Sequence, residues 1–148
     1  MSAATKRKDA VIKLFTRAHR TLTQLSGGRL GRTTAGLPIV KLTTTGRKSG
    51  KPRTVMLATP IPPDGRYIVV ASKGGDDRHP DWYLNLVADP EVIVEAVGGE
   101  GPMPMTARTA TAAEKAELWP QIATGEAGYA AYQRKTERDI PVVICEPR

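Results

Sequence analysis

The chain has few of the residues that cross-link small secreted domains or bind metal ions. It contains one cysteine, Cys145, so no internal disulfide can form, and this usage is typical of cytoplasmic proteins. Its two histidines, His19 and His79, lie far apart and have no cysteine close by in the sequence. Zinc sites need several such ligands at short spacings. The sequence therefore predicts a cytoplasmic protein that holds no metal.

Long apolar stretches and aromatic residues are also scarce. No segment approaches the roughly 20 apolar residues that a membrane-spanning helix requires. The first residues, MSAATKRKDAV, lack the apolar region of a secretory signal. Aromatic residues make up 5% of the chain, and no recognised nucleic-acid-binding motif is present. We therefore expect neither a membrane span nor a nucleic-acid-binding module.

Acidic residues are rare in the first third of the chain. Residues 1–53 contain thirteen Lys or Arg and one acidic residue, Asp9, whereas the rest contains nine basic and fourteen acidic residues. A cationic segment of this kind indicates an anionic partner. Charge alone leaves open whether that partner is a nucleic acid, a membrane surface or a phosphorylated cofactor.

The N-terminal region, residues 1–37, combines a predicted helix with a predicted loop at 29–37. Apolar residues recur every three or four positions over residues 9–26, and basic residues fall on another face, which predicts an amphipathic helix. Such a helix either covers the core with its basic face in water or contacts anionic lipid at the periphery of the inner membrane.

Residues 38–148 predict a single domain with an α+β fold. Strands are expected at 38–45, 53–61, 67–72, 91–97, 103–109 and 140–145. Helices are expected at 80–88, from Thr111 to an end near Trp119 and Pro120 or shortly beyond them, and at 126–137. A capping box of Thr111 and Glu114 marks the start of the second helix. Clustered strands with few long crossovers favour a barrel of about six mainly antiparallel strands, flanked by three to four helices.

Residues 43–53, TTTGRKSGKPR, place four cations in a turn between two predicted strands. Gly46 and Gly50 permit positive φ angles or a crowded backbone, and Ser49 adds a hydroxyl donor. A turn of this kind can direct backbone N–H groups and cationic side chains at one phosphate. The alternative is a hairpin tip that only faces water. The cations are Arg47, Lys48, Lys51 and Arg53.

Residues 71–85, ASKGGDDRHPDWYLN, begin at the end of the predicted buried strand at 67–72. Lys73 can neutralise an anionic group, and Gly74 and Gly75 let a ligand approach the backbone closely. The segment therefore predicts a ligand-binding loop. Trp82, on the next predicted helix, either offers a flat apolar surface to that ligand or is simply a core residue.

Tyr129 and Tyr132 lie three positions apart on a predicted helix, so they share one face. Their spacing allows two interpretations. They either line a substrate pocket or pack in the core.

Three motifs occur in order along the chain, namely LTTTGRKSGKPR at 42–53, VVASKGGDDRHPDWYLNL at 69–86 and YAAYQRKTERDIPVVICEP at 129–147. Together they resemble the deazaflavin-dependent nitroreductase family of actinobacteria over nearly three quarters of the chain. The resemblance implies a split β-barrel, the fold of flavin-mononucleotide oxidoreductases. It also implies coenzyme F-420, a polyanionic 8-hydroxy-5-deazaflavin. The expected activity is hydride transfer from reduced F-420 to a quinone, an enone or unsaturated lactone, or a nitroaromatic.

The resemblance further implies which residues contact the coenzyme and substrate. The phosphate region would contact Arg47, Lys48, Ser49 and Arg53, and the adjoining wall would be Thr54, Val55 and Met56. The deazaflavin would be lined by Val70, Ala71, Ser72, Lys73, Gly74 and Gly75, and closed on its other side by Asp81, Trp82, Tyr83, Leu84 and Asn85. The expected catalytic residues are Ser72, which would hold the acceptor oxygen, and Tyr129 and Tyr132. The proton would come from one of these tyrosines or from solvent.

Two other functions fit the same residues. A flavin-mononucleotide enzyme of the same fold would use the basic turn for its single phosphate. A non-catalytic deazaflavin-binding protein would hold the coenzyme without turnover. For the enzyme, the expected partner is a small-molecule hydride acceptor, and the expected oligomeric state is a monomer or a weak homodimer.

Overall fold

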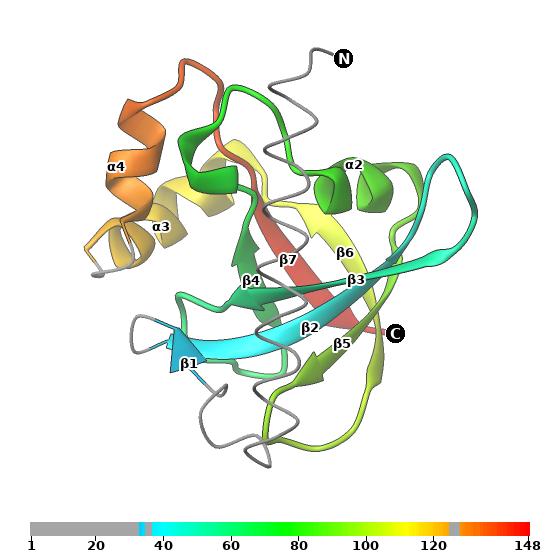
Figure 1. The fold of residues 1–148 in the computed structure, drawn as a ribbon. Coiled ribbons are helices and arrows are strands. Elements are labelled where there is room, and N and C mark those ends of the chain that lie inside the picture. The colour runs from blue at the N-terminus through cyan, green and yellow to red at the C-terminus, as the bar shows by residue number, and fades with distance from the viewer. Residues whose placement is uncertain (1–32, 35–36, 125–127) are drawn as a thin grey trace.

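The computed structural model describes residues 33–34, 37–124 and 128–148, which form a curled sheet with short helices (Figure 1). The strands are β1 Thr33–Thr34, β2 Leu37–Thr45, β3 Pro52–Ala58, β4 Tyr67–Val70, β5 Glu91–Ala96, β6 Met103–Thr109 and β7 Val142–Pro147. The helices are the 3-10 turn η1 Lys73–Gly75, α2 Asp81–Ala88, α3 Ala112–Ala123 and α4 Tyr129–Arg134. The helix predicted at 9–26, and with it the proposed lipid contact, lies outside the described residues.

The strands pair in the order β1-β2-β5-β6-β7-β4, with β3 also paired to β2, and every pair is antiparallel. Strand β4 is an edge at one end of this sheet, and β3 shares the other end with the short β1 along β2. Within the residues described, β3 and β4 follow each other in the chain without pairing. The curled sheet is therefore a split β-barrel, and the predicted fold is confirmed.

Two apolar clusters lie on opposite faces of β7. Val143 and Cys145 belong to the cluster inside the barrel, whereas Val142 and Ile144 pack with residues of α3 and α4. Successive residues of a strand point to opposite faces, so burial on both faces requires a continuous apolar run. This explains the pattern from which the strand at 140–145 was predicted.

Strand β2 shows the alternating pattern of a sheet with only one buried face. Val40 and Leu42 are buried in the barrel, whereas Lys41 and Thr43 lie on its outer face. A groove of about 220 Å³ lies on this outer face and is lined by Lys41, Thr43, Thr54, Ile93 and Glu95.

The helix boundaries follow the predicted signals, with one departure inside α3. Oγ1 of Thr111 accepts from the N–H of Glu114 at 3.2 Å, and the N–H of Thr111 donates to the Glu114 carboxylate at 2.9 Å. The predicted capping box is therefore confirmed. Pro120 lies within α3, which continues to Ala123. Proline has no N–H, so the preceding turn of the helix loses one of its hydrogen bonds there.

Several predicted boundaries were wrong by a few residues. The strands predicted at 53–61 and 67–72 end at Ala58 and Val70, and α4 is shorter than the helix predicted at 126–137. The loop predicted at 29–37 contains β1, whose two residues pair with the start of β2. The paired residues of β3 end at Ala58 and those of β4 at Val70, and local sequence does not reveal where a partner strand stops.

Candidate functional site

The basic turn is the tip of the β2–β3 hairpin, and two backbone hydrogen bonds close it. The N–H of Gly46 donates to the carbonyl of Lys51, and the N–H of Gly50 donates to the carbonyl of Gly46, each at 2.8 Å. Gly50 has a φ of 70°, which favours glycine. A Cβ at Gly46 would lie 2.6 Å from Oγ of Ser49. Both glycines therefore shape the turn, as predicted.

Arg47 fastens this turn to helix α2. Its Nη1 donates to Oδ1 of Asn85 at 2.9 Å, and its backbone N–H donates to the same oxygen at 3.1 Å. Its Nη2 lies 3.3 Å from a carboxylate oxygen of Asp81. Asn85 is only 4% exposed and donates from Nδ2 to Oγ1 of Thr44 at 3.2 Å. The hairpin and α2 therefore hold each other through a buried amide group.

The remaining cations of the turn face water. Lys48, Lys51 and Arg53 are exposed, and none of them forms an ion pair with another residue in the part of the chain described. Ser49 is also exposed, and its Oγ accepts from the N–H of Lys51 at 3.2 Å. Three cations without a carboxylate partner, held on a closed hairpin, are suited to bind a polyanionic group.

The predicted wall on β3 is divided between the two faces of the sheet. Oγ1 of Thr54 lies 2.8 Å from Oγ1 of Thr43, and both residues line the outer groove. Val55 packs against the cluster inside the barrel. Met56 shares the face of Thr54, because alternate residues of a strand point the same way. The three residues therefore do not present their side chains to one ligand surface.

The segment after β4 contains three successive residues in the left-handed region. Their φ values are 46° at Lys73, 63° at Gly74 and 85° at Gly75. Lys73 is the only residue other than glycine with a positive φ in the described part of the chain. This conformation costs a residue with a Cβ about 1–2 kcal/mol. Backbone strain of this kind is concentrated at functional sites, so this loop is a strong candidate for contact with a ligand.

The two glycines of this loop have different surroundings. A Cβ at Gly75 would lie 2.9 Å from the carbonyl oxygen of Tyr132 and 3.0 Å from the side chain of Lys135. At Gly74, no atom lies within 4 Å of the added Cβ position. Gly75 therefore lets the loop pack against α4, whereas Gly74 leaves space beside the backbone. The residues before them, Ala71 and Ser72, are buried.

Helix α2 presents its residues to three different neighbours. Trp82 is 7% exposed and belongs to the cluster inside the barrel, which supports its interpretation as a core residue. Oη of Tyr83 lies 2.9 Å from Oγ1 of Thr109, and its ring lies 4.9 Å from the ring of His79. Asp81 and Asn85 instead meet the hairpin, and Leu84 is half-buried. These residues do not form one continuous surface.

Tyr129 and Tyr132 pack edge to face, with 6.1 Å between their ring centroids. Tyr129 is 8% exposed and packs with α3 and β7, and burial raises its pKa to about 12. Tyr132 is half-buried, and its ring lies 5.8 Å from Nζ of Lys135. Of the two, Tyr132 is better placed to meet a substrate.

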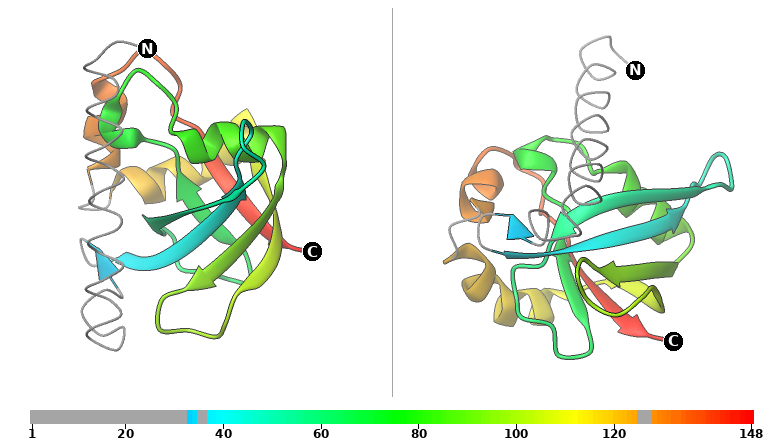
Figure 2. Two further views of the ribbon diagram at one scale, coloured as in Figure 1. Left: turned by 45° about the vertical axis from the view of Figure 1, so that its right-hand side comes forward. Right: turned by 60° about the horizontal axis from the view of Figure 1, so that its bottom comes forward.

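The candidate residues lie at one end of the barrel. The loop after β4 lies beside α4, and the hairpin lies beside α2, all toward the top of the molecule in Figure 1 and in the left view of Figure 2. The hairpin continues into edge strand β3, and edge strand β4 continues into the strained loop. The predicted cofactor residues therefore come from both strands that border the opening of the barrel.

One residue of the third motif was given no role by the sequence, yet it contacts the strained loop. Arg138 donates to the carbonyls of Ala71, Ser72 and Asp76. These partners lie more than 60 positions away in the chain, so no local pattern could reveal the contacts. A basic residue beside the apolar run at 140–145 was the only available signal.

Other reactive groups do not form a recognisable site in the described part of the chain. No cluster of three or more His, Cys, Asp or Glu there is placed to hold a metal ion. Burial raises the pKa of Cys145 to about 12, so its thiol is unreactive. None of the described helices is long and apolar enough to cross a membrane.

Comparisons with known proteins agree with this geometry. A sequence family described as F420H(2)-dependent quinone reductase matches residues 15–147. An F420H(2)-dependent quinone reductase of Mycobacterium tuberculosis is 38% identical over 136 residues, which cover 89% of each chain. A solved F420-H2 dependent reductase is 46% identical, with a TM-score of 0.65, and covers 74% of this chain and 94% of its own. A structure described as a domain-swapped dimer is 41% identical, with a TM-score of 0.65, and covers 90% and 96%.

Proposed function

Because this chain belongs to the F420H(2)-dependent quinone reductase family, we propose that it binds coenzyme F-420 and reduces a quinone with it. The observation that carries the proposal is the pair of segments bordering the opening of the barrel. A cationic hairpin leads into β3, and a strained, glycine-containing loop follows β4. F-420 joins a polyanionic tail to a flat ring, so it requires one surface of each kind.

The tail is held by the exposed cations of the hairpin. Lys48, Lys51 and Arg53 supply positive charge that no described carboxylate neutralises. Arginine adds a planar fork that can donate two hydrogen bonds to one phosphate. Arg47 contributes by keeping the turn against Asn85, so its first task is to place the other cations.

The ring is held by the loop after β4. Gly74 leaves space beside the backbone. Ala71 and Ser72, at the start of the loop, are buried. Trp82 supports this region from the core. A site that excludes water from one side of the ring protects the hydride from side reactions.

The protein's own contribution to the chemistry is a proton and an oriented acceptor. When bound, reduced F-420 supplies the hydride equivalent. Reduction of a quinone also consumes a proton, which we assign to Oη of Tyr132. The hydroxyl of Ser72 donates a hydrogen bond to the acceptor oxygen. Tyr129, which is buried beside Tyr132, holds the neighbouring ring in place.

Charge favours F-420 over flavin mononucleotide, the main alternative. Flavin mononucleotide carries a single phosphate, whereas the hairpin offers three cations without carboxylate partners among the described residues. The longer anionic tail of F-420 can contact more of these cations than a single phosphate can. Purified protein should be titrated with F-420 and with flavin mononucleotide, and then assayed with reduced F-420 and a panel of quinones and enones. We expect preferential binding of F-420 and quinone turnover. Preference for flavin mononucleotide would overturn the proposal, and F-420 binding without turnover would indicate a carrier.

Substitution of Tyr132 tests the proton assignment. Removal of a general acid typically slows a reaction by about a hundredfold or more. We expect Tyr132→Phe to lower kcat with menadione to that extent while the Kd for F-420 changes little. Tyr67→Phe, in half-buried packing on β4, is the matched control. An unchanged kcat in Tyr132→Phe would remove this tyrosine from proton delivery.

We propose that the protein is a monomer or a weak homodimer in solution. A relative that is 41% identical has been solved as a domain-swapped dimer, so exchange of segments is accessible to this fold. Light scattering over a range of protein concentrations tests the proposal. A stable dimer at every concentration would contradict it.

A further inference from the structure

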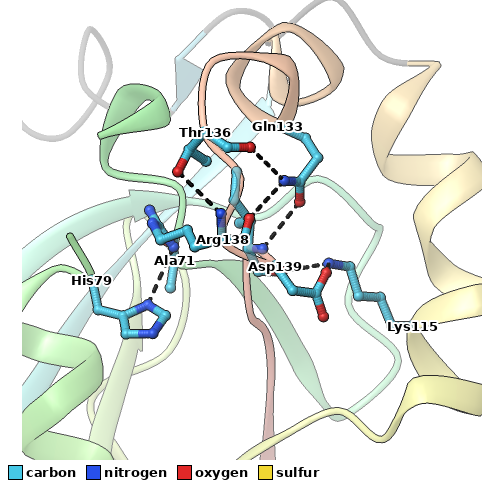
Figure 3. Close-up of polar contacts among 8 residues, drawn as sticks. Ala71, His79, Lys115, Gln133, Thr136, Arg138 and Asp139 are labelled. Atoms are coloured by element: carbon cyan, nitrogen blue, oxygen red, sulfur yellow. Dashed lines mark hydrogen bonds and ion pairs between the residues drawn. The ribbon is translucent and has the colours of Figure 1, made fainter. Parts of the chain in front are cut away.

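Arg138 lies between α4 and β7, and all three nitrogens of its guanidinium group donate to the loop after β4. Figure 3 shows the arginine beside Ala71 and His79. Its Nε donates to the carbonyl of Asp76 at 2.8 Å, and its Nη2 donates to the carbonyl of Ser72 at 2.8 Å. Its Nη1 donates to the carbonyl of Ala71 at 3.2 Å and lies 3.2 Å from Nδ1 of His79. One cation therefore joins both ends of the strained segment.

The loop needs such a cation because its backbone is in an unfavourable conformation. Lys73 has a positive φ, which an unsupported chain would seldom adopt. The carbonyls on either side of it converge on one place, and converging oxygens repel unless a donor lies between them. Strained backbone persists only where surrounding contacts over-determine it. The contacts from Arg138 provide that constraint.

Arg138 is itself held in place by its neighbours. Its carbonyl accepts from Nε2 of Gln133 at 2.8 Å, and its N–H donates to Oγ1 of Thr136 at 3.3 Å. The next residue, Asp139, forms an ion pair with Lys115 of α3 (Figure 3). Arg138 is therefore held against α4 through Gln133 and against α3 through the neighbouring Asp139.

Near neutral pH, Arg138 is charged and His79 is neutral. Burial lowers the pKa of Arg138, and the charges of Asp76 and Asp77 oppose that shift. Arginine starts from a pKa so high that it stays protonated. Burial, followed by the charge of Arg138, lowers the pKa of His79. His79 is therefore neutral, and its Nδ1 can accept the hydrogen bond from Arg138.

We propose that Arg138 is a positioning residue for coenzyme F-420, because its contacts with the carbonyls of Ala71, Ser72 and Asp76 hold the loop in the shape that receives the ring. The inference rests on the proposed function. Arg138 does not touch the coenzyme; it acts through the backbone of the loop. Because it also belongs to the segment that leaves α4, it connects the loop to the helix that carries Tyr132.

Two substitutions of Arg138 test this role. Arg138→Met removes every donor, and Arg138→Lys restores a charge without the planar fork. We expect Arg138→Met to weaken F-420 binding by about tenfold or more, since it removes several charge-assisted hydrogen bonds. Arg138→Lys should recover part of that loss, and it remains informative if Arg138→Met does not fold. The KM for F-420 should rise in both, with a smaller change in the KM for the quinone.

Arg108→Met is the matched control. Arg108 donates three side-chain hydrogen bonds, to Glu114 and Glu146, and none of these residues belongs to the loop. It should lower thermal stability without changing the Kd for F-420. Hydrogen exchange of the coenzyme-free proteins gives a readout independent of activity. Amides of residues 71–76 should exchange faster in the Arg138 variants than in Arg108→Met.

The outcomes separate the inference from the proposed function. If the unaltered protein does not bind F-420, the proposed function fails. If it binds F-420 and the Arg138 variants bind it equally well, while losing only the stability that Arg108→Met also loses, Arg138 is merely structural and the inference is overturned. Unchanged exchange at residues 71–76 would overturn it as well.

Discussion

The hairpin tip and the loop after β4 are both fastened by an arginine, but the arginine belongs to a different place in each case. Arg47 is part of the hairpin and reaches out to Asn85 on α2. Arg138 is distant from the loop in sequence and reaches into it from the α4–β7 connection. The other cations of the hairpin are exposed to water. In the loop, the backbone carbonyls accept hydrogen bonds from Arg138.

Basic residues in the two segments therefore have different tasks. The hairpin presents charge to a ligand, because Lys48, Lys51 and Arg53 have no ion-pair partner among the residues that the structure describes. In the loop, Arg138 donates to backbone carbonyls and so maintains the backbone conformation, which is what the loop offers to a ligand. A polyanionic tail requires the first, and a flat ring requires the second.

The largest effect is expected from removing charge at the hairpin. The double variant Lys48→Gln, Arg53→Gln should weaken F-420 binding by about a hundredfold, because two charge-assisted contacts are lost. Fluorescence titration measures this, and the loss should shrink as salt screens the wild-type contacts. The control is Arg66→Gln, Arg148→Gln, which removes the same charge from two positions outside the hairpin, each in an ion pair with a carboxylate. Equal losses in both doubles would show that only net charge matters.

The next largest effect is expected on the stability of the hairpin attachment. Asn85→Ala removes a buried amide that accepts from Arg47 and donates to Thr44, so the free energy of unfolding should fall by about 2 kcal/mol. Urea unfolding measures it. Asp81→Asn, which weakens only an exposed ion pair, should change the stability by less than about 1 kcal/mol. A larger loss in Asp81→Asn would mean that the ion pair, and not the amide, fastens the hairpin.

A pair of glycine substitutions sharpens the account of the loop. Both Gly74 and Gly75 have positive φ, so alanine at either position should cost about 1 kcal/mol. At Gly75 the added Cβ also meets the carbonyl of Tyr132, so Gly75→Ala should destabilise the protein further and loosen the loop from α4. Thermal unfolding compares the two. Equal destabilisation would indicate that the contact with α4 is unimportant.

The smallest effect is expected from pH. The pKa of His79 is lower in the folded protein than its ordinary value of 6.5, so below about pH 6.5 the unfolded chain takes up a proton that the folded protein refuses. Stability should therefore fall as the pH drops through this range. The fall should be shallower in His79→Gln, which cannot be protonated. Identical slopes from pH 7 to pH 5 would show that His79 does not contribute.

Local signals predicted much of the fold because they depend on residues close together in the chain. Strand β6 occupies the predicted 103–109, and the capping box of Thr111 and Glu114 forms as expected. The apolar run at 140–145 predicted a buried strand because β7 is covered on both faces. The composition of the basic turn also predicted a hairpin tip in which Gly46 and Gly50 determine the backbone geometry.

Contacts between distant segments could not be predicted in the same way. The resemblance placed Thr54, Val55 and Met56 on one wall, but the alternation of β3 sends Val55 into the barrel. Gly74 and Gly75 look alike in sequence, and only the position of α4 distinguishes them. The role of Arg138 depends on carbonyls that the topology brings to it from beyond β4.

Hydrogen exchange of the protein with and without saturating F-420 shows which segments the coenzyme contacts. If the coenzyme lies across the opening of the barrel, amides of the hairpin at 46–53 and of the loop at 71–76 should both gain protection, while those of β5 and β6 remain unchanged. Protection confined to one of the two segments, or to the outer groove lined by Lys41 and Glu95, would contradict the account.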